Sequence, residues 1–462
     1  MSGILHSAFC VLSSEFSQRV RPAIGRRVLG IVLCLCSVVS AAQRLTVEDC
    51  VRLGLANSPT LVASQAGIDY ADAKSLEAST ARLPSLTLTG AYTRLSPISP
   101  FVFDIPVPGK APVAETVVPS INNNYQAKLS LQQPLFTGLR LQNASAIAAE
   151  NARAARTDFA RDKNQLLLDI RSAYWGLYQA VQAETLVQQN RRRMQVHLAD
   201  IRNRQRVGLA TLNDVLKVRV QAANVALTEV ETHNAIQVAT TALDNLVGLP
   251  LDTEVEPASE PGGAGAGGGD SLPALIEQAT KRRPEVQSLE ARVRAGSDAV
   301  NLARAAWYPQ VSATGDLTYA RPNSRNFPPQ DKFTPSWDVG VGASFAVWNW
   351  GQASHQTAEA RAQLRQVQVS LTQLKNAIAL QVTQDFLALQ KAQAEVIAAD
   401  TAVVQAAENQ QVAHDGFEAG TALNSDLLDA EVNLLQAQLN LAQSRAGREI
   451  SRAKLAQTLG EQ

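Results

Sequence analysis

Four stretches of the chain alternate apolar and polar residues with a period of two, which predicts strands with one apolar and one polar face. They lie at about 85–103, 124–136, 309–321 and 336–348. The polar residues of these stretches include charged ones. The apolar positions are the following: Leu86, Leu88, Gly90, Tyr92; Tyr125, Ala127, Leu129, Leu131; Val311, Ala313, Gly315, Leu317, Tyr319; Trp337, Val339, Val341, Ala343, Phe345.

The polar faces carry Lys128, Asp316 and Asp338. A half-buried sheet on a soluble domain is one interpretation, but no nearby predicted helix has a wide apolar face left to cover it. Aromatic residues near the strand ends favour membrane-spanning strands instead, because such residues form girdles at the two interfaces of a bilayer. They are Tyr92, Tyr125, Tyr319, Trp337, Phe345, Trp348 and Trp350.

Two much longer segments have helical spacing, at about 139–206 and 352–417. The first contains no proline and a single glycine, and one helix of that length would be about 100 Å long. Each is followed by a turn and a second helix, and the seam after residue 217 repeats at intervals of four and three, which is typical of a coiled coil. A shorter helical segment begins at a capping box, Thr46 to Asp49, and restarts near Pro59.

The chain repeats itself. Pro84 and Gly90 recur as Pro309 and Gly315 at an offset of 225, and the turn after the first long helix recurs at an offset of 212. The first repeat covers 43–248 and the second covers 272–460, with a Gly- and Pro-rich linker at 249–271. A GxGxxG pattern in this linker is not preceded by a strand, so a linker is favoured over a nucleotide site. Residues 96–123 are rich in Pro, Ser and Asn and predict a loop.

The helix–turn–helix tips have the pattern Gly-x-x-x-x-x-Asp, from Gly208 to Asp214 and from Gly420 to Asp426. The glycine is expected to form the turn. In the second tip, Asn424 and Ser425 are expected to cap the following helix.

Residues 1–42 resemble a secretory signal with a long leader. Arg26-Arg27 precede an apolar run at 28–39, and small residues allow cleavage near Ala41 or Ala42. Three of the four cysteines fall in this leader, which leaves Cys50 alone and predicts no intrachain disulfide.

Charge and chemistry narrow the functional classes. The chain has 42 basic and 42 acidic side chains, and its aromatic residues do not interleave with a basic patch, so nothing favours nucleic-acid binding. The five histidines are scattered and form no metal-ligand spacing. No nucleophile elbow or phosphate-binding lysine occurs. We therefore expect no catalytic residue, no metal site and no cofactor.

Four strands cannot close a barrel, and an open sheet edge is not tolerated in lipid. Several chains must then share one barrel. Two chains would supply eight strands, which leaves an interior just filled by side chains, whereas three would supply twelve and leave room for a lumen.

With both strand pairs, both long helices and both tips, residues 45–460 resemble the TolC-like outer-membrane efflux proteins. This resemblance implies an α+β membrane protein: a homotrimer with a shared 12-stranded barrel in the outer membrane and a periplasmic α-barrel of coiled-coil helices. It also implies a passive exit duct for efflux or type I secretion, opened by docking to a periplasmic adaptor and an inner-membrane pump.

The resemblance assigns roles to tip residues. Asp426 and Asp429 match the acidic gate positions, where three copies would form two rings of carboxylates. The alternative is that they are aspartates favoured by a helix N-terminus. Asp214, Thr211 and Phe417 match the latch, and the turns at Gly208, Leu209, Gly420 and Thr421 match the region of adaptor docking.

Two departures from the family pattern affect the latch. Phe417 lacks a hydroxyl, and Ala422 stands where an arginine can occur. We therefore expect closure to depend more on packing and on cations bound to the acidic rings. The tips also differ from each other, because Lys217 in the first occupies the place of Asp429 in the second.

Two other functions stay open. A porin-like diffusion or uptake channel would be expected to have many more strands per chain and no long helices. A structural coiled coil or adhesin would not need two strand pairs with lipid-facing alternation.

Overall fold

The computed structural model describes residues 43–105, 108, 113–251, 253–262 and 271–461. The predicted leader at 1–42 and the glycine-rich centre of the predicted linker lie outside these residues. The helices are α1 (Val47–Asn57), α2 (Pro59–Thr80), α3 (Arg140–Arg206), α4 (Leu212–Val247), α5 (Leu272–Arg282), α6 (Pro284–Arg304), the short 3₁₀ helix η1 (Ala305–Trp307), α7 (Gln352–Glu418) and α8 (Asn424–Thr458). The strands are β1 (Gln43–Leu45), β2 (Ser85–Arg94), β3 (Phe101–Ile105), β4 (Val113–Val118), β5 (Asn123–Phe136), β6 (Val255–Pro257), β7 (Gln310–Arg321) and β8 (Thr334–Ser344).

Local chemistry sets the first helices. Thr46 Oγ1 accepts a hydrogen bond from the Asp49 amide at 3.1 Å, and the Asp49 carboxylate accepts one from the Thr46 amide at 3.3 Å. The predicted capping box at Thr46–Asp49 is thus confirmed. Ser58 separates α1 from α2, and Pro59 follows at the first helical position, where its missing N–H costs nothing.

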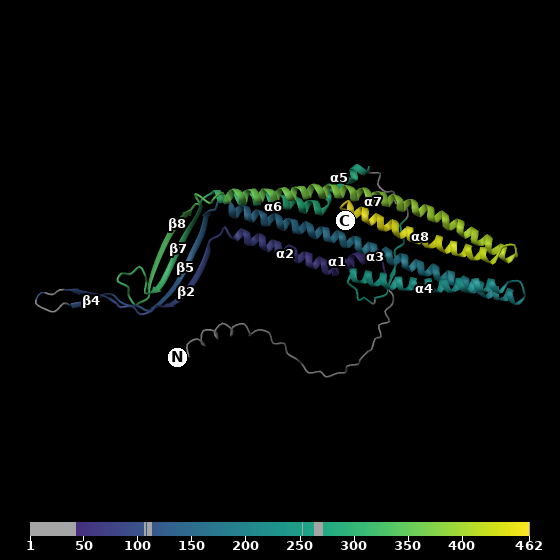
Figure 1. The fold of residues 1–462 in the computed structure, drawn as a ribbon, viewed down its shortest axis with the longest axis horizontal. Coiled ribbons are helices and arrows are strands. Elements are labelled where there is room, and N and C mark those ends of the chain that lie inside the picture. The colour runs from purple at the N-terminus through teal and green to yellow at the C-terminus, as the bar shows by residue number, and fades with distance from the viewer. Residues whose placement is uncertain (1–42, 106–107, 109–112, 252, 263–270, 462) are drawn as a thin grey trace, which may run out of the picture. The chain divides into compact units, whose positions relative to one another are not determined.

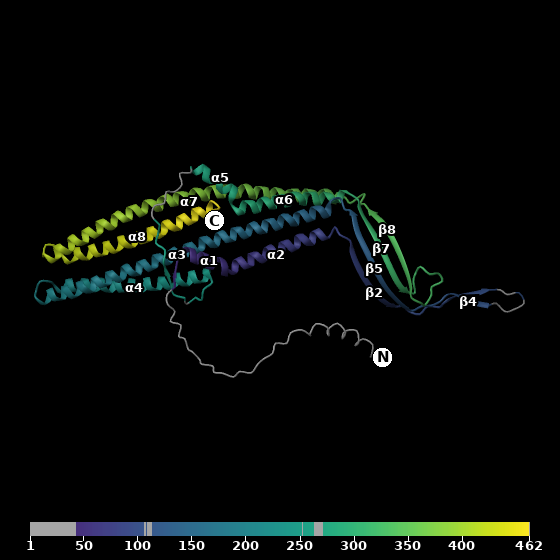
Figure 2. The ribbon, with the colours of Figure 1, turned by 180° about the vertical axis from the view of Figure 1, so that it is seen from behind.

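The long helices α3 and α7 have 67 residues each, which corresponds to about 100 Å. Each folds back into a hairpin, α3 with α4 and α7 with α8, and α8 also packs on α3. Figures 1 and 2 show α2 and α6 running along the parts of α3 and α7 nearer to the strands. No helix among the described residues is both long and apolar enough to cross a bilayer.

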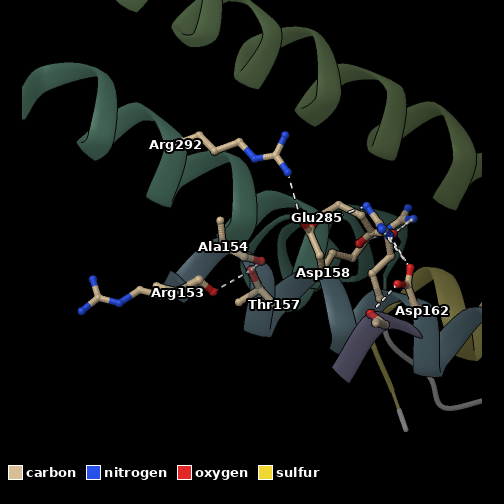
Figure 3. Close-up of polar contacts among 10 residues, drawn as sticks. Arg153, Ala154, Thr157, Asp158, Asp162, Glu285 and Arg292 are labelled. Atoms are coloured by element: carbon tan, nitrogen blue, oxygen red, sulfur yellow. Dashed lines mark hydrogen bonds and ion pairs between the residues drawn. The ribbon is translucent and has the colours of Figure 1, made fainter. Parts of the chain in front are cut away.

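Ion pairs attach α2 and α6 to α3. Figure 3 shows Arg292 of α6 reaching Asp158 of α3, a contact of 2.9 Å. Arg294 of α6 binds Glu150 at 2.8 Å, and Asp72 of α2 binds Arg156 at 2.7 Å. The strand-proximal part of α3 is therefore held to two further helices by charge as well as by packing.

The four longer strands form one antiparallel sheet in the order β2-β5-β7-β8. Its register places apolar residues opposite apolar residues, and polar residues opposite polar residues, across all four strands. Leu88, Leu129, Leu317 and Trp337 form one apolar row, and Thr87, Ser130, Asp316 and Asp338 form a polar one. On the polar face Lys128 pairs with Asp316 at 2.9 Å.

The apolar face of this sheet is uncovered in the single chain. Leu88 is 73% exposed and Val339 is 76% exposed. In the described residues no other strand pairs with the outer edge of β2 or of β8. The sheet thus presents an apolar surface and two open edges.

The structure corrects two predicted strands. The strand expected at 85–103 ends at Arg94, because Pro97 and Pro100 cannot donate to a strand ladder. The strand expected at 336–348 ends at Ser344, after which the chain turns toward α7 with positive φ at Trp350 and Gly351. The residues between β8 and α7 keep exposed aromatic side chains, including Trp348.

The loop expected at 96–123 contains a hairpin. Strands β3 and β4 pair with each other in a separate two-stranded sheet. The proline-rich composition hid this hairpin, because the short runs Phe101–Ile105 and Val113–Val118 lie between prolines.

Candidate functional site at the helix tips

The two helix hairpins end in turns of the same construction, at the ends of the helices away from the sheet (Figure 1). Gly208 and Gly420 have φ of 82° and 74°, a conformation that glycine adopts without steric cost. The Leu209 amide bonds the Arg204 carbonyl at 2.8 Å, and the Thr421 amide bonds the Gly416 carbonyl at 2.8 Å. Each bond satisfies a carbonyl at the helix end, as in a Schellman motif.

The helices that leave the turns are capped differently. Thr211 is the N-cap of α4, where its hydroxyl accepts from the Asp214 amide and the Asp214 carboxylate accepts from the Thr211 amide at 3.0 Å. In α8 the N-cap is Leu423, whose amide donates to Asp426 at 3.1 Å. The prediction that Asn424 and Ser425 cap α8 is wrong, because both lie inside the helix. The second tip thus has the hydrogen bond from the N-cap amide to the aspartate but lacks the hydrogen bond to an N-cap side chain.

Completing or removing the box should change local stability. We expect Leu423→Thr to slow amide exchange at the start of α8 about fivefold, and Thr211→Ala to speed it about as much in α4, since an N-cap is worth about 1 kcal/mol. Hydrogen-exchange mass spectrometry measures both. Thr228→Ala, which removes a hydroxyl in mid-α4, is the control. Unchanged exchange in Leu423→Thr would contradict the capping argument.

Phe417 lies inside the protein. It is 8% exposed, and its ring packs against α3, with the Arg204 guanidinium 4.5 Å and the His197 ring 5.3 Å from its centroid. Arg204 also donates to the Phe417 carbonyl at 3.2 Å. The contacts of Phe417 with α3 are thus aromatic and cation–π, together with one hydrogen bond to its backbone carbonyl.

The tips are joined through Asn424. Its side chain lies 2.9 Å from His197 Nε2 and also donates to the Asp214 carbonyl at 3.5 Å. Of the predicted latch residues, Thr211 and Asp214 thus meet each other in the cap, and the Asp214 backbone carbonyl reaches Asn424 of the second tip. The role of this group as a latch stays a prediction.

The buried position of His197 predicts that this junction is sensitive to pH. Burial lowers the pKa of His197 from its usual 6.5, against opposing effects of Asn424, Asp200 and Glu431, while His414 lowers it further. The unpacked state therefore binds a proton more readily than the packed one. We therefore expect the packing around His197 to be fully stable above about pH 6.5 and to weaken as the pH falls below that value.

We expect amide exchange around Asn424 to be faster at pH 5 than at pH 7.5, after correction for intrinsic exchange rates. His197→Gln should remove most of this difference, because glutamine can hydrogen-bond but does not titrate. His233→Gln, on α4 beside Glu184, is the control. The same pH dependence in His197→Gln would exclude His197 as its source.

The predicted gate residues lie at the start of α8. Asp426 caps the helix through Leu423, as described. Asp429 lines a groove of about 480 Å³ between α4 and α8, together with Lys217 and Asn213. Lys217 and Asp429 occupy matching positions in the two repeats but carry opposite charges, and both line this groove. The turn residues Leu209 and Leu423 are exposed.

A buried polar cluster beside the tips was not predicted. Glu431 of α8 binds Arg193 of α3, and Asn190 and Gln410 bind the same carboxylate. The sequence contains one indication of this cluster. Asn190 and Arg193 lie about one helical turn apart, between the apolar residues Val187 and Met194, which are buried. Within the part of the chain that the structure describes, no three His, Cys, Asp or Glu side chains are placed to hold a metal ion.

Comparison with known proteins agrees with this arrangement. The family model for the outer membrane efflux protein matches residues 51–249 and 275–461. The chain is 23% identical over 451 residues to the outer membrane protein TolC of Salmonella enteritidis, covering 94% of this chain and 85% of that protein. It is 24% identical over 319 residues to the outer membrane efflux protein BepC of Brucella suis, covering 66% of each.

Solved structures share the fold. The outer membrane protein VceC of Vibrio cholerae superposes with a TM-score of 0.73 at 19% identity, covering 90% of this chain and 96% of that one. The CmeC outer membrane channel of Campylobacter jejuni superposes with a TM-score of 0.76 at 15% identity, covering 90% and 85%.

Proposed function

Because the chain belongs to the outer membrane efflux protein family, a TolC-like family of the outer membrane, we propose that it forms the exit duct of a tripartite efflux or type I secretion system. In this proposal the duct is passive. It receives its cargo from an inner-membrane pump, and a periplasmic adaptor links the two.

The open sheet carries this proposal. Its apolar face is exposed and both of its edges are unpaired among the described residues, so neither lipid nor water suits a single copy. Pairing β8 of one copy with β2 of the next removes every edge when the ring closes. Three copies supply twelve strands, and the aligned polar rows then face a lumen wide enough for solutes.

The long helices extend this lumen. Strands β5 and β8 lead into α3 and α7, so a ring of sheets continues as a ring of helix hairpins in the periplasm. The tips are then the periplasmic mouth. We assign the gate to Asp426 and Asp429, the latch to Asp214, Thr211 and Phe417, and adaptor docking to the turns around Gly208, Leu209, Gly420 and Thr421.

A porin-like diffusion or uptake channel is the alternative. The four-stranded sheet and the pair of 67-residue helices favour a duct over a porin. A porin needs no periplasmic tube, because its single chain closes its own barrel.

The test uses the full-length protein in a Gram-negative strain that lacks its own exit duct. We expect a trimer on native sizing in detergent, and export that requires a co-expressed adaptor and pump. Solute uptake that proceeds equally well without adaptor and pump would favour the porin. A monomeric pore would exclude the shared barrel.

A further inference from the structure

The cluster around Glu431 joins the two helix hairpins of one chain. Glu431 lies on α8 and is 5% exposed. Its Oε2 accepts from Arg193 Nε at 3.0 Å and from Asn190 Nδ2 at 3.4 Å, both on α3. Its Oε1 accepts from Gln410 Nε2 of α7 at 3.0 Å. One carboxylate therefore holds three helices.

The place of this contact is unusual within the chain. Among the ion pairs of the described residues, Arg193–Glu431 alone joins α3 to α8. Nearer the strands, α3 is also fastened to α2 and α6, but these helices do not extend to the tips (Figure 1). Nearer the tips, the first hairpin meets the second mainly through α3 and α8. Separating the hairpins there breaks the contacts of Glu431 with Arg193 and Asn190 and leaves the contact with Gln410 in place.

The cluster is not fully satisfied. Nη2 of Arg193 is buried and has no hydrogen-bond acceptor among the described residues. The Arg193 side chain as a whole is 34% exposed, but a buried N–H without an acceptor loses its solvation and regains it when water enters. The ion pair thus stabilises the contact between the two hairpins, while hydration of the unpaired nitrogen lowers the free energy needed to separate them. A contact with both properties is suited to reversible opening.

We propose that the Glu431 cluster is a releasable clasp that keeps the second hairpin against the first and so holds the periplasmic mouth narrow. This inference rests on the proposed function, and Glu431, Arg193, Asn190 and Gln410 are its positioning residues. The clasp supplies a polar link within one chain, where Phe417 and Ala422 have no polar side-chain group.

The test is single-channel conductance of the purified full-length protein in planar bilayers. We expect Glu431→Gln to raise the ratio of open to closed time about tenfold or more, since it removes a charged hydrogen-bond acceptor. The double variant Arg193→Gln with Glu431→Gln should open as well without leaving the Arg193 charge unpaired. Exchange of the two charges, Arg193→Glu with Glu431→Arg, should restore most of the closure.

The matched control is Glu229→Gln. Glu229 pairs with Arg191, two residues before Arg193, but this pair joins α3 to α4 within one hairpin. We expect wild-type gating from it. Native sizing confirms that each variant has assembled.

The clasp is refuted if the double Gln variant, correctly assembled, gates like wild type, or if Glu229→Gln opens the channel as much as Glu431→Gln. A charge-exchange variant that assembles but stays as open as the double Gln variant would also count against it. A wild-type protein that is not trimeric, or that forms no channel, would instead refute the proposed function.

Discussion

Leu88→Arg is expected to prevent accumulation of the protein in the outer membrane, whereas Thr87→Arg on the neighbouring position is not. Leu88 lies in the exposed apolar row with Leu129, Leu317 and Trp337. An arginine on the lipid face near the middle of the bilayer costs about 2–4 kcal/mol. In the proposed trimer, three copies in one barrel would multiply this cost.

Thr87 is the matched control because its side chain lies on the other face of β2. Its row continues through Ser130, Asp316 and Asp338, so an arginine there meets carboxylates on the polar face of the sheet. Both variants add the same charge to the same strand. Membrane fractionation and native sizing measure the result. Equal accumulation of the two variants would show that the apolar face does not contact lipid.

Periodicity made the sheet and the helices predictable, because both depend on local spacing. Alternation of Leu86 and Leu88 with threonine predicts β2, and the proline-free run from about 139 to 206 lies where α3 is found. Strand ends were less predictable. Alternation does not mark where the ladder stops, so the prolines after Arg94 and the turn near Trp350 had to be seen in the structure.

Short local signals worked only where the capping chemistry is complete. Thr46 and Asp49 form the predicted box because both side chains are present. At the second tip the sequence offers Asn424 and Ser425, which are good caps, but the turn at Gly420 places Leu423 at the N-cap. The geometry of the turn decided the position, and the preference of the residues did not.

Contacts between distant segments could not be predicted. Glu431 and Arg193 are 238 positions apart, and Asn424 and His197 are 227 apart. A heptad pattern identifies a polar residue in a seam, but it does not say which residue of another helix faces it. His197 was therefore interpreted as one of several scattered histidines, although it contacts both α7 and α8.

The second large effect is expected at the acidic residues of the tips. Asp429→Asn should raise the concentration of divalent cation that half-blocks the channel by about tenfold or more. In the proposed trimer three carboxylates would lie near one axis, where they attract a cation strongly because water is restricted. Asp426→Asn should act in the same direction, although Asp426 also accepts from the Leu423 amide, so part of its effect is loss of a cap.

Lys217 gives this prediction a control of opposite sign. It lines the same groove as Asp429, so its charge offsets part of the negative field. We expect Lys217→Gln to make the block tighter, whereas Glu418→Gln, before the turn, should change it little. All of these shifts should shrink in 1 M monovalent salt, where the Debye length is about 3 Å. If Asp429→Asn and Lys217→Gln left the block unchanged, the aspartates would be helix-terminal residues, and closure would rest on packing and on the clasp at Glu431.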